Sequence, residues 1–182
     1  MATRRRTKDP EAAIRAAGIS LIGAQGFDKV SVAGICREAG VANGTFYNFW
    51  RTKEAFTEHM IGEGTQELAV ALLRETTDPR DAAEQREDVA LIVAFARENA
   101  GLMRLALSPA LGEISDRVVA LLVDQRAEAL AASCGPRARD LARAETAITQ
   151  AFLFDALNGA RALDDDLVNV LVKLRLSLFQ TA

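Results

Sequence analysis

The stretch Ser31–Lys53, which reads SVAGICREAGVANGTFYNFWRTK, decides how the rest of the chain is interpreted. Ser31 is a good helix N-cap, and apolar residues recur after it at helical spacing until Ala39-Gly40-Val41, where the glycine allows a tight turn. A second short helix is predicted from about Ala42 to Phe49. Two short helices joined by a tight turn are typical of a helix-turn-helix, whose second helix enters the major groove of DNA.

The second helix of this pair combines an apolar side with a polar one. Apolar residues at 32, 35, 36, 39, 41 and 46 can pack the pair against the preceding helix, and we expect Phe46, Phe49 and Trp50 to belong to the core. The small or polar residues left exposed are Asn43, Gly44, Thr45, Tyr47 and Asn48. An asparagine amide can pair with adenine, a glycine lets the backbone approach closely, and hydroxyl groups suit phosphate oxygens, as does Lys53 nearby.

This stretch resembles the signature of the TetR family of transcriptional regulators. The family's recognition helix has the form Gly-Thr-(Phe/Leu)-Tyr, followed by an aromatic pair and a Lys-(Glu/Asp); here the residues are Gly44-Thr45-Phe46-Tyr47-Asn48-Phe49-Trp50 and then Lys53-Glu54. Upstream, Gly26-Phe27, Ser31-Val32, Ile35 and Ala39-Gly40-Val41 also fit, so the detailed match covers about residues 9–56. The sequence departs from the pattern at Ala42, where members often have serine, and at Trp50, where phenylalanine is more usual.

The resemblance implies roles for individual residues. Thr45, Tyr47 and Lys53 resemble the family's phosphate contacts, and Ser31 caps a helix that often touches phosphate as well. Asn43, Gly44 and Asn48 fall where the base-facing residues vary between members. Arg4–Arg6 is either an arm that enters the minor groove or a basic tail without a fixed contact.

Charge is distributed unevenly along the chain. Residues 1–53 contain nine Lys/Arg and four Asp/Glu, a net charge of +5, whereas the remainder contains 13 basic and 21 acidic residues, a net charge of −8. This distribution indicates that the basic N-terminal part binds a polyanion and that the acidic body does not.

The rest of the chain is predicted to be helical as well, because alanine and leucine dominate and alternating β-branched residues are scarce. A first helix begins at Asp9-Pro10 and ends at Gly26, and a long one runs from Lys53 to about Arg74. Further helices are expected around residues 89–96, 100–107, 114–134, 137–158 and 164–179. This pattern predicts an all-α fold of about nine helices, with a helix-turn-helix DNA-binding domain over residues 1–53 and a ligand-sensing and dimerisation domain over 54–182.

For the body, the resemblance implies a dimer interface and a ligand cavity. The last two helices should pair with their copies, because 167–179 is apolar around more than one face. The helix before it carries two stripes, one formed by Ile148, Phe152 and Asp155 and a second one formed by Ala147, Ala151, Phe154 and Asn158. The helices between residues 53 and 134 should enclose the cavity. Its candidate lining residues are Phe95, Leu102, Met103, Leu107, Ile148 and Phe152, with Asp155 as a polar contact to the ligand, a dimer contact or a partner in a helix cap. With no buried basic cluster evident, a small apolar or amphipathic ligand is expected.

Other classes of protein fit the sequence less well. One histidine and two distant cysteines argue against the common catalytic triads and a Cys/His zinc site, so we expect no enzyme, no metal and no cofactor. No apolar run approaches the ~18 residues of a membrane span, and no signal peptide is evident, so a cytoplasmic protein is expected. Cys36 and Cys134 are expected to be free thiols, with a redox pair as the alternative.

The expected function is therefore a ligand-responsive transcriptional regulator. It should act as a repressor that binds a near-palindromic operator on double-stranded DNA as a homodimer and is released by a small molecule. The alternative is a helical adaptor protein whose helix-turn-helix head binds protein and senses no ligand.

Overall fold

The structure is a computed structural model that describes residues 9–72, 78–108 and 111–180. Within these ranges every regular element is a helix, and the α-helices number nine, as the sequence predicts. In chain order they are α1 (Pro10–Gln25), η1 (Phe27–Lys29), α2 (Val32–Glu38), α3 (Asn43–Phe46), α4 (Lys53–Leu72), α5 (Ala82–Glu98), α6 (Ala100–Ala106), α7 (Glu113–Cys134), η3 (Gly135–Arg137), α8 (Ala138–Leu157) and α9 (Asp165–Gln180).

Helix boundaries follow local capping chemistry. Asp9 and Ser31 cap α1 and α2, and Thr52 accepts a hydrogen bond from the Ala55 amide at the start of α4 (3.1 Å). Gly26 ends α1 with a φ of 88°, a conformation that only glycine adopts readily. The Asp164 carboxylate accepts from the Leu167 amide and begins α9 (3.1 Å). The predicted end of α4 near Arg74 lies outside the described residues.

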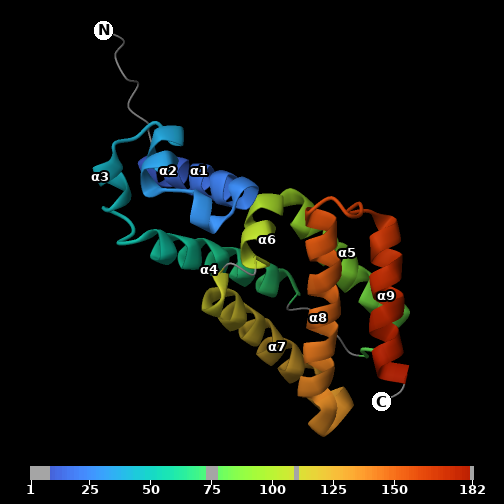
Figure 1. Cartoon of the computed structure of the whole chain (residues 1–182). Coiled ribbons are helices and arrows are strands. Elements are labelled where there is room, and N and C mark those ends of the chain that lie inside the picture. The colour runs from blue at the N-terminus through green and yellow to red at the C-terminus, as the bar shows by residue number, and fades with distance from the viewer. Residues whose placement is uncertain (1–8, 73–77, 109–110, 181–182) are drawn as a thin grey trace.

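The helices separate into a small head and a larger body. We call residues 9–53 the head, which contains α1 to α3, and residues from 54 onward the body. Figure 1 shows the head at one end of the molecule, α4 running from it into the body, and α8 and α9 side by side on the far side. None of the helices within the described ranges combines the length and apolarity that crossing a bilayer requires.

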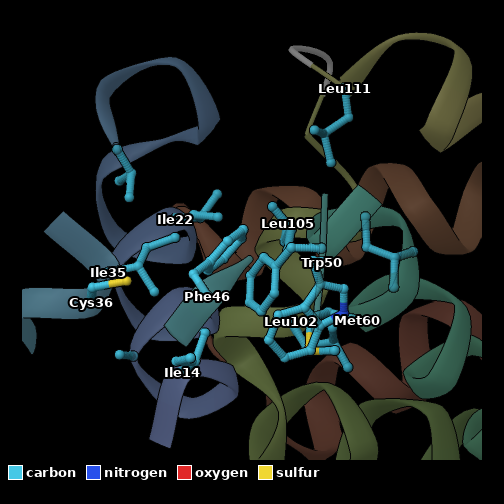
Figure 2. Close-up of a cluster of buried hydrophobic side chains, with 14 residues drawn as sticks. Ile14, Ile22, Ile35, Cys36, Phe46, Trp50, Met60, Leu102, Leu105 and Leu111 are labelled. Atoms are coloured by element: carbon cyan, nitrogen blue, oxygen red, sulfur yellow. The ribbon is translucent and has the colours of Figure 1, made fainter. Parts of the chain in front are cut away.

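A single buried cluster joins head and body. Ile14, Ile35 and Phe46 of the head pack together with Met60 of α4 and Leu105 of α6, as Figure 2 shows. The packing therefore continues across the boundary predicted at residue 53.

Two glycines allow α6 to pack closely against its neighbours, one in the head and one on α4. A Cβ atom on Gly23 of α1 would lie 2.6 Å from the carbonyl oxygen of Gly101 on α6, which is too close for any side chain. On α4, a Cβ atom at Gly64 would overlap the side chain of Leu102 on α6. Helix α6 is thus held between the head and α4 with no room for added atoms.

Candidate DNA-binding surface and ligand cavity

The turn between α2 and α3 has the geometry of a helix-turn-helix. Gly40 adopts a φ of 70°, and the amide of Val41 donates to the carbonyl of Cys36 (3.0 Å), which closes the turn. Ser31 Oγ accepts from the amide of Gly34 (3.1 Å), so its own hydroxyl proton remains available to an external acceptor.

Phe46 fixes the orientation of α3. Its side chain is fully buried, and its ring centroid lies 5.6 Å from those of both Trp50 and Phe56. The prediction that Phe49 belongs to the core is wrong, because 42% of this side chain is exposed although its ring lies against Trp50. Since α3 ends at Phe46 instead of continuing to Phe49, the chain turns there and carries Phe49 to the surface.

The side of α3 opposite Phe46 is open to solvent. Asn43, Gly44 and Asn48 are exposed, Tyr47 is 57% exposed, and Thr45 is half-buried. A Cβ atom added to Gly44 would meet nothing within 4 Å, so packing inside the protein does not require glycine there.

The start of α3 lacks a side-chain cap. Ala42 occupies the N-cap position, and no side chain, including that of Asn43, accepts a hydrogen bond from the first turn. The backbone carbonyl of Ala42 instead accepts from the amide of Thr45 (2.9 Å). The amide group of Asn43 is thus not committed to capping.

Lys53 has internal partners that the sequence did not suggest. Its ammonium group donates to the carbonyl oxygens of Phe27 (2.6 Å) and Val30 (2.9 Å) and lies 3.9 Å from the centre of the Phe27 ring. Lys53 therefore fastens the start of α4 to the segment that precedes α2. Because an ammonium group has three donors, these two hydrogen bonds leave one N–H for a further acceptor.

Cys36 lies inside the head, below this surface. Its side chain is fully buried, and burial raises the pKa of the thiol, an effect that a backbone hydrogen bond at Phe46 only partly opposes. The thiolate is therefore disfavoured, and Cys36 serves as a small apolar core residue. Cys134, at the end of α7, is half-buried, and both cysteines are free.

The body contains a cavity of about 130 Å³ that is lined mainly by apolar side chains. Residues from α4, α5, α6 and α7 line it, together with residues from α8, on which three lining residues were predicted, and from α9, on which none was. The lining residues are Ile61, Gly64, Thr65, Leu68, Ile92, Phe95, Leu102, Met103, Ala106, Leu107, Val118, Leu122, Arg126, Glu145, Thr146, Thr149, Gln150, Leu153 and Arg175.

The structure divides the seven predicted pocket residues. Phe95, Leu102, Met103 and Leu107 line the cavity. Ile148, Phe152 and Asp155 do not: Ile148 packs in the body core, Phe152 lies 4.5 Å from the guanidinium of Arg161, and Asp155 is exposed. These three residues lie on a different face of α8 from the residues that line the cavity, about a third of a turn around the helix.

A buried charged cluster at the cavity went unrecognised in the sequence. Arg126 donates to Glu145 through Nε (2.6 Å) and Nη2 (3.0 Å), and Arg175 donates to the same carboxylate through Nε (2.6 Å). The expectation that no basic cluster is buried here is therefore wrong. The sequence did contain a signal that Glu145 is buried, because its spacing places it on the same face of α8 as the buried Ala142, Thr149 and Leu153.

The two arginines keep Glu145 ionised. Desolvation alone would raise the pKa of Glu145, but attraction to Arg175 and the hydrogen bonds and charge of Arg126 together hold that pKa below its usual range. Glu145 and Arg175 are both almost completely buried. The cavity thus has an apolar wall and a permanently charged end.

Comparisons with known proteins agree with this geometry. Residues 14–60 match the sequence model of the bacterial regulatory proteins of the tetR family. No curated protein sequence matches the chain. The match agrees with the expectation of a regulator and not an enzyme.

Solved structures share the whole fold. A transcriptional regulator from Rhodococcus sp. RHA1 is 20% identical with a TM-score of 0.75, covering 96% of this chain and 98% of that one. A TetR-like regulator from the same organism is 16% identical with a TM-score of 0.76, covering 98% and 100%. The fatty acid degradation regulator FadR from Bacillus halodurans is 16% identical with a TM-score of 0.74, covering 94% and 97%. The helix-turn-helix segment thus matches the tetR family of bacterial regulatory proteins over residues 14–60, and the all-helical fold of the chain is similar to that of solved transcriptional regulators.

Proposed function

We propose that this protein is a ligand-responsive repressor that binds a near-palindromic operator as a homodimer. One observation carries the proposal: α3 buries Phe46 completely while Asn43, Gly44, Tyr47 and Asn48 face solvent. An adaptor that binds protein through this helix would instead expose an apolar stripe. With chromosomal DNA as its partner, the protein would act in the cytoplasm.

We assign the contacts with DNA by chemistry. Asn43 and Asn48 read base edges, and Gly44 admits the duplex close to the helix backbone. Phosphates are contacted by the hydroxyls of Ser31, Thr45 and Tyr47 and by the remaining N–H of Lys53. This division predicts which substitutions alter sequence preference and which weaken binding to every sequence.

Much of the positive charge of the head lies in the N-terminal segment. Residues 9–53 contain five basic and four acidic residues, a net charge of +1, so the remaining +4 of the sequence up to residue 53 comes from residues 1–8, which include Arg4–Arg6 and lie outside the described residues. We propose that this segment contributes to DNA affinity through phosphates or the minor groove.

Dimerisation is proposed through α8 and α9. Ala147, Ala151, Phe154 and Asn158 are all exposed along one stripe of α8, and Val170 of α9 is 38% exposed. Pairing α8 and α9 with their copies would cover these side chains and set two recognition helices about one DNA turn apart. Substituting both Phe154 and Val170 by glutamate should yield a monomer in size-exclusion chromatography. Leu121→Glu, at a similarly exposed leucine on α7, should leave the dimer intact.

Ligand and DNA are proposed to oppose each other through α4 and α6. Ile61 of α4 and Leu102 of α6 line the cavity and also belong to the cluster that includes the head core. A ligand that alters their packing would change the separation of the paired heads, and by reciprocity DNA would weaken ligand binding equally.

Selection from a random DNA pool tests the proposal. A regulator should enrich a near-palindromic duplex, and its affinity should fall steeply between 50 and 200 mM salt, conditions chosen because phosphate contacts release counterions over this range. Replacing Arg4–Arg6 by alanine should reduce the slope of log affinity against log salt by up to ~0.9 for each phosphate that the segment no longer neutralises. Failure to enrich any duplex would favour the adaptor alternative.

A further inference from the structure

The charges at the cavity form a balanced set. Arg126 of α7 and Arg175 of α9 share the carboxylate of Glu145 on α8, and all three residues line the cavity. A second carboxylate, that of Asp88 on α5, is buried and lies 3.9 Å from Arg126 Nη1. Two guanidinium groups thus face two carboxylates. Because an ion in a buried site needs a counter-charge, an anionic or a cationic ligand would find none there.

The hydrogen-bond donors of Arg175 are matched less completely than its charge. Arg175 directs two N–H groups at Glu145, one on Nε (2.6 Å) and one on Nη2. A guanidinium group has five N–H donors, and no acceptor within residues 9–72, 78–108 and 111–180 takes any of the other three. The side chain is only 4% exposed, so bulk water has little access to these donors. A buried donor without an acceptor is costly, and an acceptor that enters from the cavity would remove this cost.

The remaining lining defines the other half of the ligand. Residues such as Ile92, Phe95 and Leu102 can offer a ligand only apolar side-chain contacts. The cavity volume of about 130 Å³ approaches the ~150 Å³ of an engineered apolar cavity that binds benzene. The apolar part of a fitting ligand is therefore about as large as a six-carbon ring.

We infer that the cavity binds a small uncharged carbonyl compound, such as a ketone, ester or amide, whose oxygen accepts a hydrogen bond from Arg175 and whose apolar part contacts α4, α5 and α6. A carbonyl oxygen brings two lone pairs and no net charge, so it satisfies the unpartnered donors and leaves the ion pairs balanced. A hydrogen bond from a charged donor is also stronger than one between two neutral groups. This inference rests on the proposed function, because it names the chemical class of the effector.

Four probes built on one ring test the inference on the full-length wild-type protein. Isothermal titration calorimetry at pH 7 compares cyclohexanone with methylenecyclohexane, in which a CH₂ group replaces the oxygen, with cyclohexanecarboxylate and with cyclohexylammonium. We expect cyclohexanone to bind at least ten-fold more tightly than each of the other three, because it alone brings an acceptor without a charge. A smaller preference over any of the three, or no binding of cyclohexanone, would overturn the inference.

A charge-balanced double substitution tests the role assigned to Arg175. Glu145→Gln combined with Arg175→Met removes one anion and one cation, and Arg126 still faces the carboxylate of Asp88. The preference for cyclohexanone over methylenecyclohexane should disappear in this variant, whereas the affinity for methylenecyclohexane should change little. A folded double variant that keeps the ten-fold preference would show that Arg175 is not the donor and would overturn the inference.

Arg143→Gln is the control, because it removes a cation at an exposed position of α8. It should leave the affinities for both probes unchanged. Circular dichroism checks that each variant is folded. Should the double variant fail to fold, the four probes decide on the wild type alone.

A mobility-shift assay distinguishes failure of the inference from failure of the proposed function. DNA binding by a wild-type protein that shows no preference for cyclohexanone would overturn only the ligand class. Binding of cyclohexanone with the expected preference but without any change in DNA affinity would support the ligand class and contradict release by ligand.

Discussion

The head and the body of this protein place their polar residues in opposite ways. In the head, an aromatic cluster around Phe46 fills the interior, and the polar side chains of α3 face solvent. In the body, the outer stripe of α8 is partly apolar, whereas Arg126, Glu145 and Arg175 are gathered at an internal cavity. The partners proposed for the two regions differ accordingly: a large polyanion for the head, and a second copy of the chain and a small ligand for the body.

The largest expected effect comes from breaking the charged cluster of the body. Glu145→Leu should lower the free energy of unfolding by about 3–5 kcal/mol, because two buried guanidinium groups lose their shared carboxylate. Chemical denaturation monitored by circular dichroism measures this loss. Replacing Arg126 and Arg175 by methionine in the same protein should restore most of the stability, and failure of this rescue would contradict an electrostatic origin.

The contact between head and body gives the next largest effect. Gly23→Ala places a methyl group against the backbone of Gly101 and should cost about 1–3 kcal/mol in unfolding free energy. Gly62→Ala is the matched control, because a Cβ atom on this exposed glycine of α4 meets nothing within 4 Å. A stable Gly23→Ala protein would mean that head and body pack less tightly than described.

The buried carboxylate of Glu145 should make the stability of the body depend on pH. The pKa of Glu145 is lowered by folding, so its contribution to stability is complete above the unfolded value of ~4.3 and is lost as pH falls through the folded value. Below pH ~4.3 the unfolding free energy of the wild type should fall more steeply than that of Glu145→Gln, by up to ~1.4 kcal/mol per pH unit. Urea denaturation at several pH values measures both slopes, and parallel slopes would show that Glu145 gains nothing from its partners.

The smallest effect on stability is expected at the surface of the head. Gly44→Ala should raise the unfolding free energy by about 0.5–1 kcal/mol, because glycine is a poor helix former and the added methyl group has space. The same change should weaken DNA binding about ten-fold, within the ~1–3 kcal/mol typical of one good contact. Fluorescence anisotropy measures the DNA affinity, and chemical denaturation measures the unfolding free energy. Gly62→Ala is the control: only Gly44→Ala should raise the unfolding free energy and weaken DNA binding at the same time.

The difference between the two regions also explains what the sequence could predict. The head's signals are local: Ser31, Gly40 and the spacing of apolar residues determine the turn, and Phe46 indicates which side of α3 is buried. Cavity residues are brought together from distant helices, so Phe95 and Leu102 were found by their apolar character while Ile148 and Phe152 fell on the neighbouring stripe. The partners of Glu145 and Lys53 lie 19 to 30 residues away in sequence, and no local pattern pairs them.

The most direct test of the account is the affinity of α3 variants for the selected duplex and for a scrambled duplex at one salt concentration. Tyr47→Ala should weaken binding to both by a similar factor, whereas Asn48→Ala should bring the two affinities closer together. If both variants stay folded and bind both duplexes as the wild type does, the exposed face of α3 is not the surface that reads DNA.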